Sequence, residues 1–276
     1  MSGNSGAAPA GTLLLVGCGQ MGGAMLRGWL SGAAASRFAV VEPASPAADF
    51  AGNDKIAWHR HASELPVEVR PEAVVFAVKP QVFDDVVPPY RRFAEAGTVF
   101  LSIAAGRTIA GMERHLGAAA IVRAMPNTPA AIGRAISVAC PNGRVSAGQR
   151  RLCERLLAAI GESAWVEDEA LLDPVTAVSG SGPAYVFLLI EAMAAGGEKM
   201  GLPADLALRL AQATVAGSGE LARVAGESPA RLRENVTSPG GTTRAALDVL
   251  MAGDGLPALM ERAVAAATRR SRELAS

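Results

Sequence analysis

The chain has 276 residues, half of them hydrophobic, and its 26 basic residues balance its 26 acidic ones. Such a chain is long enough to bury a large core in one or two domains. Its zero net charge argues against a nucleic-acid partner and against a polybasic membrane surface, so we expect a small-molecule ligand.

The three cysteines, Cys18, Cys140 and Cys153, show neither an even count nor the spacing of a metal site. This favours a reducing, cytoplasmic environment and predicts no metal. Residues 1–11 lack the basic start and the apolar core of a signal peptide, so we predict that they form a flexible tail. No uninterrupted apolar run is long enough to span a bilayer, and the nearest, residues 184–195, carries Glu191. We therefore expect no membrane partner.

The first expected strand, residues 12–16, runs into a glycine-rich turn of the form GxGxxG at residues 17–22. Apolar residues then recur at helical spacing as far as Gly32. A strand before the turn and a helix after it are the context that dinucleotide binding requires, whereas an isolated glycine turn is common. We predict that the cofactor pyrophosphate is bound here, by Gly17, Gly19, Gln20, Met21 and Gly22.

A second expected strand, residues 38–41, ends at Glu42. An acidic residue at about this distance from the glycine turn accepts hydrogen bonds from the adenosine ribose. No arginine stands beside Glu42 to receive a 2′-phosphate, so the pattern favours NADH over NADPH. The alternative is a solvated loop carboxylate before Pro43.

Further buried strands are expected at residues 73–78, 98–103, 121–122, 135–139 and 164–166, with an amphipathic helix at residues 147–160. Strands that alternate with helical stretches predict a doubly wound sheet, whose ligands bind beyond the carboxyl ends of the strands. Lys79 could bind the cofactor phosphates or could simply be a solvated lysine at a strand end. The turn around Asn127, which has a proline on each side, could contact the cofactor or could simply connect two elements. The cofactor-site candidates at these strand ends are Ala77, Val78, Lys79, Pro80, Ala104, Ala105, Gly106, Met125, Pro126 and Asn127.

After about Glu167 the pattern changes to long helical periodicity without a strand. We therefore predict an α/β fold with a Rossmann-type doubly wound sheet in residues 12–166, followed by an all-α domain in residues 167–276 that mediates dimerisation. Residues 184–200 are apolar almost all round, which is typical of a helix buried on every side. In a small domain such burial is easier against a second subunit, so we expect a homodimer with interleaved helical domains. Residues 203–224 and 255–272 are two more expected helices.

Residues 237–243 (TSPGGTT) precede an apolar-periodic segment, residues 245–251, and have the composition of a helix start that binds an anion. Pro239 restricts the backbone, Gly240 and Gly241 allow a ligand to approach closely, and Thr242 and Thr243 leave free N–H groups in the first turn. The alternative is an ordinary helix cap.

Five motifs in this order resemble the pyrroline-5-carboxylate reductases: GCGQMG at residues 17–22, AVKP at 77–80, RAMPNTP at 123–129, SGSGPAY at 179–185 and SPGGTT at 238–243. The resemblance extends over nearly the whole chain. It implies a Rossmann domain, a helical dimerisation domain, and a homodimer or a larger assembly of dimers such as a decamer. The family generally prefers NADPH, but Glu42 and Ala62 depart from its pattern at positions that contact the 2′-phosphate, so we expect that NADH is used at least comparably.

The resemblance implies the last step of proline biosynthesis, the reduction of a cyclic imine carboxylate, 1-pyrroline-5-carboxylate, by hydride from NAD(P)H. A protonated imine is already electrophilic, so catalysis requires mainly that the two reactants are held in line. By resemblance, Thr243 reaches the imine nitrogen as a positioning group, with water as the source of the proton. The substrate-binding residues that the resemblance implies are Ser238, Gly240, Gly241, Thr242, Thr243, Ser181 and Glu227; for Ser181 and Glu227 a purely local role at a helix start is an open alternative.

Two other functions remain open from the sequence. A 3-hydroxyacid dehydrogenase of the related two-domain class would need a catalytic lysine in the helical half, where Lys199 is the only lysine and lies at an expected helix end. A non-enzymatic NAD(P)H-binding protein would bind the cofactor without turnover. The three histidines, His59, His61 and His115, lie outside the motifs, so we interpret them as surface residues and expect no histidine base.

Overall fold

The computed structural model describes residues 10–275, apart from the side chains of residues 95 and 96. Most of the predicted tail, residues 1–9, lies outside the described residues, and the first strand begins at Ala10, earlier than the predicted start at Thr12. The chain divides into two compact units. The first comprises Met1–Gly180 with Thr268–Ser276, and the second comprises Ser181–Ala267.

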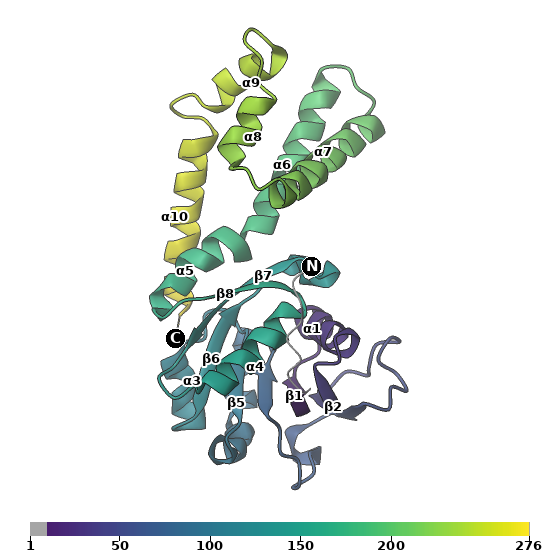
Figure 1. The fold of residues 1–276 in the computed structure, drawn as a ribbon, viewed down its shortest axis with the longest axis vertical. Coiled ribbons are helices and arrows are strands. Elements are labelled where there is room, and N and C mark those ends of the chain that lie inside the picture. Colours follow the sequence, from purple (N-terminus) through teal and green to yellow (C-terminus); the bar gives the residue numbers. More distant parts are fainter. Residues whose placement is uncertain (1–9, 276) are drawn as a thin grey trace. The chain divides into compact units, whose positions relative to one another are not determined.

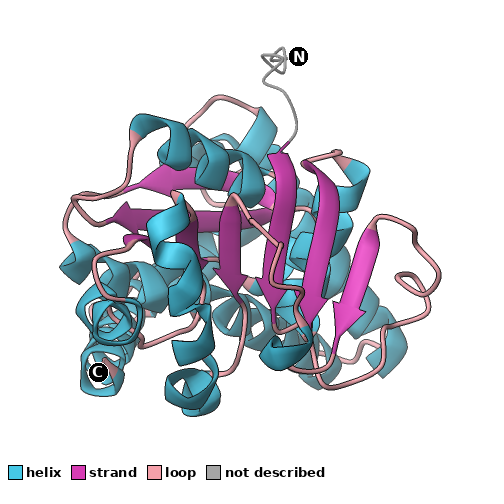
Figure 2. Cartoon of the chain, turned by 90° about the horizontal axis from the view of Figure 1, so that it is seen from below, coloured by secondary structure: helices cyan, strands magenta, loops and turns pink. Residues whose placement is uncertain are grey.

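The first unit contains an eight-stranded sheet in the order β3-β2-β1-β4-β5-β6-β7-β8. Neighbouring strands are parallel except β6 and β7. The strands are magenta in Figure 2, with helices on both faces, which confirms the predicted doubly wound sheet. The strands are β1 Ala10–Val16, β2 Ala35–Val41, β3 Ile56–His59, β4 Ala73–Phe76, β5 Val99–Ser102, β6 Ala120–Met125, β7 Ala135–Pro141 and β8 Gly161–Trp165.

Side chains alternate between two buried layers, one on each face of the sheet. In β1, Leu13 and Leu15 belong to one hydrophobic cluster, and Leu14 and Val16 belong to the other. Because successive residues of a strand point to opposite faces, a strand covered on both sides is apolar throughout. This is why the central strands were predictable as uninterrupted apolar runs.

The helices of the first unit cover these layers, and local capping defines where two of them begin. The Thr108 side chain accepts a hydrogen bond from the N–H of Gly111 at the start of α3, and Ser146 forms a capping box with Gln149 at the start of α4. The helices, labelled in part in Figure 1, are α1 Gln20–Ser31, α2 Phe83–Val86, α3 Ile109–Leu116, α4 Ala147–Ala158 and α5 Leu172–Val175.

The first unit extends beyond its last strand. Leu172 in α5 is fully buried in one of the two core clusters, and the hydroxyl of Ser271 donates to Asp173 at 2.7 Å. These contacts explain why the compact division lies after Gly180, although the strands end at Trp165, next to the predicted domain boundary at residue 166.

The second unit is helical. Helices α6 and α7 pack through small side chains, with Ala194, Ala207 and Ala211 buried between them. A Cβ at Gly197 would lie 3.1 Å from a methyl group of Leu202, which shows how closely the chain packs there. The helices are α6 Gly182–Lys199, α7 Ala204–Val224, α8 Pro229–Asn235, α9 Thr242–Leu250 and α10 Leu256–Leu274, the last of which ends in the first unit.

Within one chain helix α6 is largely exposed, so the predicted burial on all sides would need a second subunit. Phe187 and Leu188 are 59% and 63% exposed, and Ala194 is the one buried residue reported for this helix in the described chain. The continuous helical stretch Glu169–Lys199 is long and apolar enough to cross a membrane by length and composition alone, although no single apolar run in the sequence is. Such a helix is also typical of one that is covered by a protein partner.

Candidate functional site

The glycine turn between β1 and α1 has the geometry of a dinucleotide site. Gly17 has a φ of +90°, and a Cβ there would lie 2.8 Å from the carbonyl oxygen of Ala77. A Cβ at Gly22 would lie 2.2 Å from the carbonyl oxygen of Gly17, so only glycine fits at either position. Gly19 precedes α1 without a side-chain cap, so the N–H groups of the first turn, at Gln20, Met21 and Gly22, can bind an anion. These residues fit a cofactor pyrophosphate.

A cleft of about 610 Å³ opens beside this turn, at the carboxyl ends of β1, β2 and β4. This is the edge of a doubly wound sheet at which ligands bind. The structure thus brings together six of the predicted cofactor residues. They are Gly17, Gly19, Glu42, Ala77, Val78 and Lys79; Pro80 follows Lys79 at the start of a short 3-10 turn.

Glu42 is held at the edge of this cleft by the main chain. Its Oε2 atom accepts a hydrogen bond from the N–H of Cys18 at 2.8 Å, and its Oε1 atom accepts one from the N–H of Ala44 at 3.1 Å. Burial, and secondarily the charge of Glu42, raises the pKa of the Cys18 thiol to about 11. Cys18 is therefore a protonated packing residue at neutral pH and not a nucleophile.

An arginine does stand beside Glu42, contrary to the expectation from the sequence. Strand β3 pairs with β2 so that Val41 lies opposite His59, and the N–H of Glu42 donates to the carbonyl of His59 at 2.9 Å. Arg60 follows directly and lines the same cleft as Glu42, together with His61 and Ala62. The prediction missed this neighbour because β3 has only four residues and was not recognised. Its apolar and aromatic run after Gly52 and Asn53 was the available signal.

Three of the predicted cofactor residues, Ala104, Ala105 and Gly106, lie in the turn after β5. Ala104 is buried, and a Cβ at Gly106, whose φ is +73°, would lie 2.8 Å from the carbonyl oxygen of Leu274. Gly106 is thus required by packing against the end of α10. Ala105, between them, is exposed at the turn.

Arg107 connects two of the predicted loops. Its guanidinium donates to the carbonyl of Pro80 and to the carboxylate of Asp84, the latter at 2.7 Å. The second oxygen of Asp84 lies 2.8 Å from Nε2 of His115, and this hydrogen bond is the main cause that lowers the pKa of Asp84. His115 thus has a partner, while His61 lines the cleft beside the glycine turn and His59 is the last residue of β3.

The predicted turn after β6 begins later than expected, because Arg123 and Met125 belong to the strand itself. Pro126 follows the strand. The side-chain amide of Asn127 bonds to the carbonyl of Ser179 and to the N–H of Ile136. Both ends of the Asn127 amide are therefore hydrogen-bonded to main-chain groups of the protein itself.

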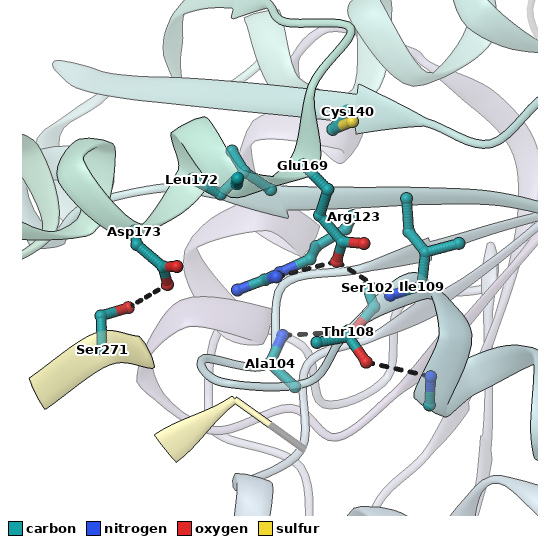
Figure 3. A network of polar contacts seen from close by, with 12 residues as sticks. Ser102, Ala104, Thr108, Ile109, Arg123, Cys140, Glu169, Leu172, Asp173 and Ser271 are labelled. Carbon is teal, nitrogen blue, oxygen red and sulfur yellow. Dashed lines mark hydrogen bonds and ion pairs between the residues drawn. The ribbon is translucent and has the colours of Figure 1, made fainter. Parts of the chain in front are cut away.

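A partly buried ion pair, which the sequence did not indicate, lies nearby and is shown in Figure 3. Arg123 is 6% exposed, and its Nη1 lies 2.8 Å from Oε1 of Glu169. The same carboxylate oxygen accepts the N–H of Ile109 at the start of α3, at 2.9 Å. Glu169 therefore connects β6, α3 and the segment that leads into α5.

The anion-binding candidate in the second unit forms a helix start, as predicted. Helix α9 begins at Thr242, its N-cap Gly241 has no side-chain cap, and Gly240 has a φ of +70°. A hollow of about 310 Å³ is lined by Thr237, Ser238, Pro239, Gly240 and Arg244. Thr243 is half-buried in the first turn, whereas Thr242 is exposed. Arg244, which the prediction did not include, adds a cation beside the free N–H groups and bonds to Asp248 at 2.9 Å.

The remaining candidates are at helix ends. Ser181 is the N-cap residue of α6, and Glu227 precedes the Ser228 cap of α8 and accepts a hydrogen bond from Asn235 at 3.2 Å. Lys199, on which the dehydrogenase alternative depends, is the exposed last residue of α6, as expected for a helix end.

Comparison with known proteins agrees with these features. The family model described as pyrroline-5-carboxylate reductase dimerisation matches residues 169–274, and the model described as NADP oxidoreductase coenzyme F420-dependent matches residues 12–106. A pyrroline-5-carboxylate reductase of Pseudomonas aeruginosa is 40% identical over 266 residues, which cover 95% of this chain and 96% of that protein.

Solved structures agree as well. The structure of a pyrroline-5-carboxylate reductase from Coxiella burnetii superposes with a TM-score of 0.89 at 32% identity, covering 97% of this chain and 99% of that one. A pyrroline carboxylate reductase from Plasmodium falciparum with NADP bound superposes with a TM-score of 0.82 at 28% identity, covering 98% and 100%. The chain belongs to the pyrroline-5-carboxylate reductase family.

Proposed function

We propose that this protein reduces 1-pyrroline-5-carboxylate to L-proline with NADH or NADPH, the last step of proline biosynthesis. The observation that carries the proposal is the 40% identity to the Pseudomonas aeruginosa reductase over almost the entire length of both chains. The glycine turn before α1 and the uncapped start of α9 support it, because the reaction needs one site for a dinucleotide and another for a carboxylate.

In the first unit, the start of α1 would receive the cofactor pyrophosphate, and Glu42 would accept hydrogen bonds from the adenosine ribose. When bound, the reduced nicotinamide supplies the hydride. The backbone N–H groups that already hold Glu42 fix its carboxylate in place, so little side-chain entropy is lost when the ribose binds.

In the second unit, the N–H groups at the start of α9 and the guanidinium of Arg244 would hold the substrate carboxylate. Thr243 would position the imine nitrogen by a hydrogen bond, and water would supply the proton. Ser238, Gly240, Gly241 and Thr242 would shape the carboxylate site, and Ser181 and Glu227 are further candidates for contacts with the substrate.

The primary test is a spectrophotometric assay with 1-pyrroline-5-carboxylate and each nicotinamide cofactor. We expect Thr243→Val to lower kcat/KM by about 10- to 1,000-fold, the loss of one hydrogen bond made in the transition state. Thr214→Val, an exposed change within α7, serves as the matched control. A wild-type protein that oxidises neither cofactor in the presence of this imine would refute the function, and unchanged kinetics for Thr243→Val would remove that residue from the mechanism.

The cofactor preference is the finer part of the proposal. We expect NADH to be used at least comparably with NADPH, because the carboxylate of Glu42 would repel a 2′-phosphate and Ala62 offers no polar contact to it. Arg60, which lines the same cleft as Glu42, is the cation that would allow NADPH to bind. A hundredfold advantage of NADPH in kcat/KM would refute the NADH preference.

Two variants separate these contributions. Arg60→Ala is expected to lower kcat/KM for NADPH about tenfold and to leave NADH nearly unchanged, as for one charge-assisted contact. Arg37→Ala, an exposed arginine on β2 that does not line this cleft, is the control. Glu42→Ser is expected to shift the preference towards NADPH.

We further propose that the protein is a cytoplasmic homo-oligomer built from interleaved dimers. The exposed apolar side chains of α6 support this, and the dimerisation model, which matches residues 169–274, includes this helix. Covering them with a second subunit removes apolar surface from water. Light scattering of the purified protein tests the assembly, and recovery of the protein only in the membrane fraction would contradict it.

A further inference from the structure

The amide of Asn127 links two segments of the first unit by hydrogen bonds at both of its ends. Its Nδ2 donates to the carbonyl of Ser179 at 3.2 Å, and its Oδ1 accepts the N–H of Ile136 at 3.0 Å. An amide with a donor contact and an acceptor contact to main-chain groups has only one suitable orientation. The side chain therefore joins the end of β6, the start of β7 and the segment that precedes α6.

The carbonyl of Ser179 needs a side-chain donor because the residue at the usual helical donor position has no backbone N–H. In an α-helix this carbonyl would accept from the N–H of residue 183, but that residue is Pro183, which has none. The N–H of the next residue, Ala184, donates instead to the carbonyl of Ser181 at 3.0 Å. A partly buried carbonyl without a donor is destabilising, and Asn127 supplies the missing donor.

The backbone around Ser179 is irregular in a way that makes its position depend on tertiary contacts. Thr176–Gly180 forms a π-helical turn between α5 and α6, and π-helical turns occur frequently at functional sites. The hydroxyl of Ser179 donates back to the carbonyl of Val175 at 3.0 Å, which is typical of bent helices. A Cβ at Gly180 would lie 2.7 Å from Cε of Met125, so the end of β6, two residues before Asn127, also packs directly against this turn.

We propose that Asn127 is a positioning residue for the reaction and not a cofactor ligand: by bonding to the Ser179 carbonyl it fixes the backbone of the π-helical turn Thr176–Gly180. The inference rests on the proposed function for its kinetic readout. Its location supports it, since Ser181 follows Gly180 directly and begins the substrate-site candidates of the second unit. A small change in the orientation of a positioning turn is enough to lower a rate without weakening the binding of a remote ligand.

Asn127→Asp is the most informative variant, because it keeps the size and the acceptor for the Ile136 N–H but replaces the donor with an oxygen that faces the Ser179 carbonyl. We expect kcat to fall by about 10- to 100-fold, the range for one misplaced hydrogen bond, while the cofactor Kd from fluorescence titration stays within about twofold of wild type. We also expect faster hydrogen exchange of the backbone amides in residues 180–186.

Asn142 provides a matched control. Its Nδ2 donates to Glu113 and to the carbonyl of Ala119, both at 3.0 Å, and its Oδ1 accepts the N–H of Ile121 at 3.1 Å. It is therefore another bridging asparagine of the first unit, without contact to the π-helical turn. Asn142→Asp is expected to lower the melting temperature but to leave kcat within about twofold of wild type.

A compensating change tests the contact itself. Pro183→Ala returns an N–H to residue 183, so the Ser179 carbonyl can regain a helical donor in the Asn127→Asp background. We expect the double variant to recover part of the lost kcat and to slow the hydrogen exchange of residues 180–186.

If the wild-type protein is active, two results would overturn the inference. A cofactor Kd raised tenfold or more in Asn127→Asp with normal kcat would return Asn127 to the cofactor site, and equal kcat for the Asn127 and Asn142 variants would reduce its role to stability. If the wild-type protein does not reduce the imine, the proposed function fails. In that case the hydrogen exchange of residues 180–186 still tests the role of Asn127 without any activity assay. Unchanged exchange in Asn127→Asp would overturn the positioning role.

Discussion

Replacing Glu169 with alanine removes one partner of the partly buried ion pair with Arg123. The two side chains are 28% and 7% exposed, and Oε1 of Glu169 also accepts the N–H of Ile109 (Figure 3). The variant leaves the guanidinium of Arg123 buried beside β6 without this carboxylate. We therefore expect Glu169→Ala to destabilise the first unit.

The size of the effect follows from burial. Removing one partner of a fully buried pair costs about 3–5 kcal/mol, because the other charge is left uncompensated. Glu169 is partly accessible to water, so the loss is reduced by roughly a third, to about 2–3 kcal/mol. Helix α3 keeps its Thr108 cap, which limits the effect of the lost bond to Ile109. For a unit of this size the change corresponds to a fall in melting temperature of about 4–12 °C.

Urea unfolding followed by tryptophan fluorescence is the suitable assay. The three tryptophans of the chain, Trp29, Trp58 and Trp165, all lie in the first unit, so their emission reports its unfolding. The protein concentration must be the same for all variants, because subunit association contributes to apparent stability.

Glu167→Ala is the matched control. Glu167 pairs with Arg150 at the same distance of 2.8 Å, but the two side chains are 74% and 38% exposed. Its loss should cost at most about 0.5 kcal/mol, and Arg150 keeps its position over the ring of Trp165. A loss below about 1 kcal/mol for Glu169→Ala, or equal losses for the two variants, would refute the reasoning from burial.

Three further outcomes are expected. Gly22→Ala should unfold at a markedly lower temperature, because its Cβ would lie 2.2 Å from the carbonyl oxygen of Gly17. Gly19→Ala, whose Cβ has open space, should melt normally but bind the cofactor at least about tenfold more weakly. Normal melting of Gly22→Ala, or normal cofactor binding by Gly19→Ala, would contradict this. The lowered pKa of Asp84, caused mainly by the hydrogen bond with His115, stabilises the fold above its unfolded pKa near 3.8 and is lost as the pH falls through the lower folded value, so Asp84→Asn should flatten the acid limb of the stability profile. An unchanged acid limb would contradict that linkage. Burial raises the pKa of Cys18 to about 11, so alkylation by iodoacetamide near pH 8 should be slow, and rapid modification would be the contrary result.

Local patterns in the sequence were enough to predict most of the α/β fold and the two helix starts, at α1 and α9, that lack a side-chain cap. The turn at Gly17 and the helix start that contains Pro239, Gly240 and Thr243 can be predicted from a few neighbouring residues. Turn geometry and helix capping depend on nearby atoms only. Continuous apolar runs likewise identify strands that are buried on both faces.

The tertiary structure alone decided which distant residues meet. Pairing of the short strand β3 with β2 places Arg60 beside Glu42, and packing of the α5 segment on the sheet brings Glu169 to Arg123. The same applies to Asn127, whose amide bonds to the carbonyl of the distant Ser179. Such contacts depend on strand order and on the register between segments far apart in the chain, and neither periodicity nor turn chemistry encodes them locally.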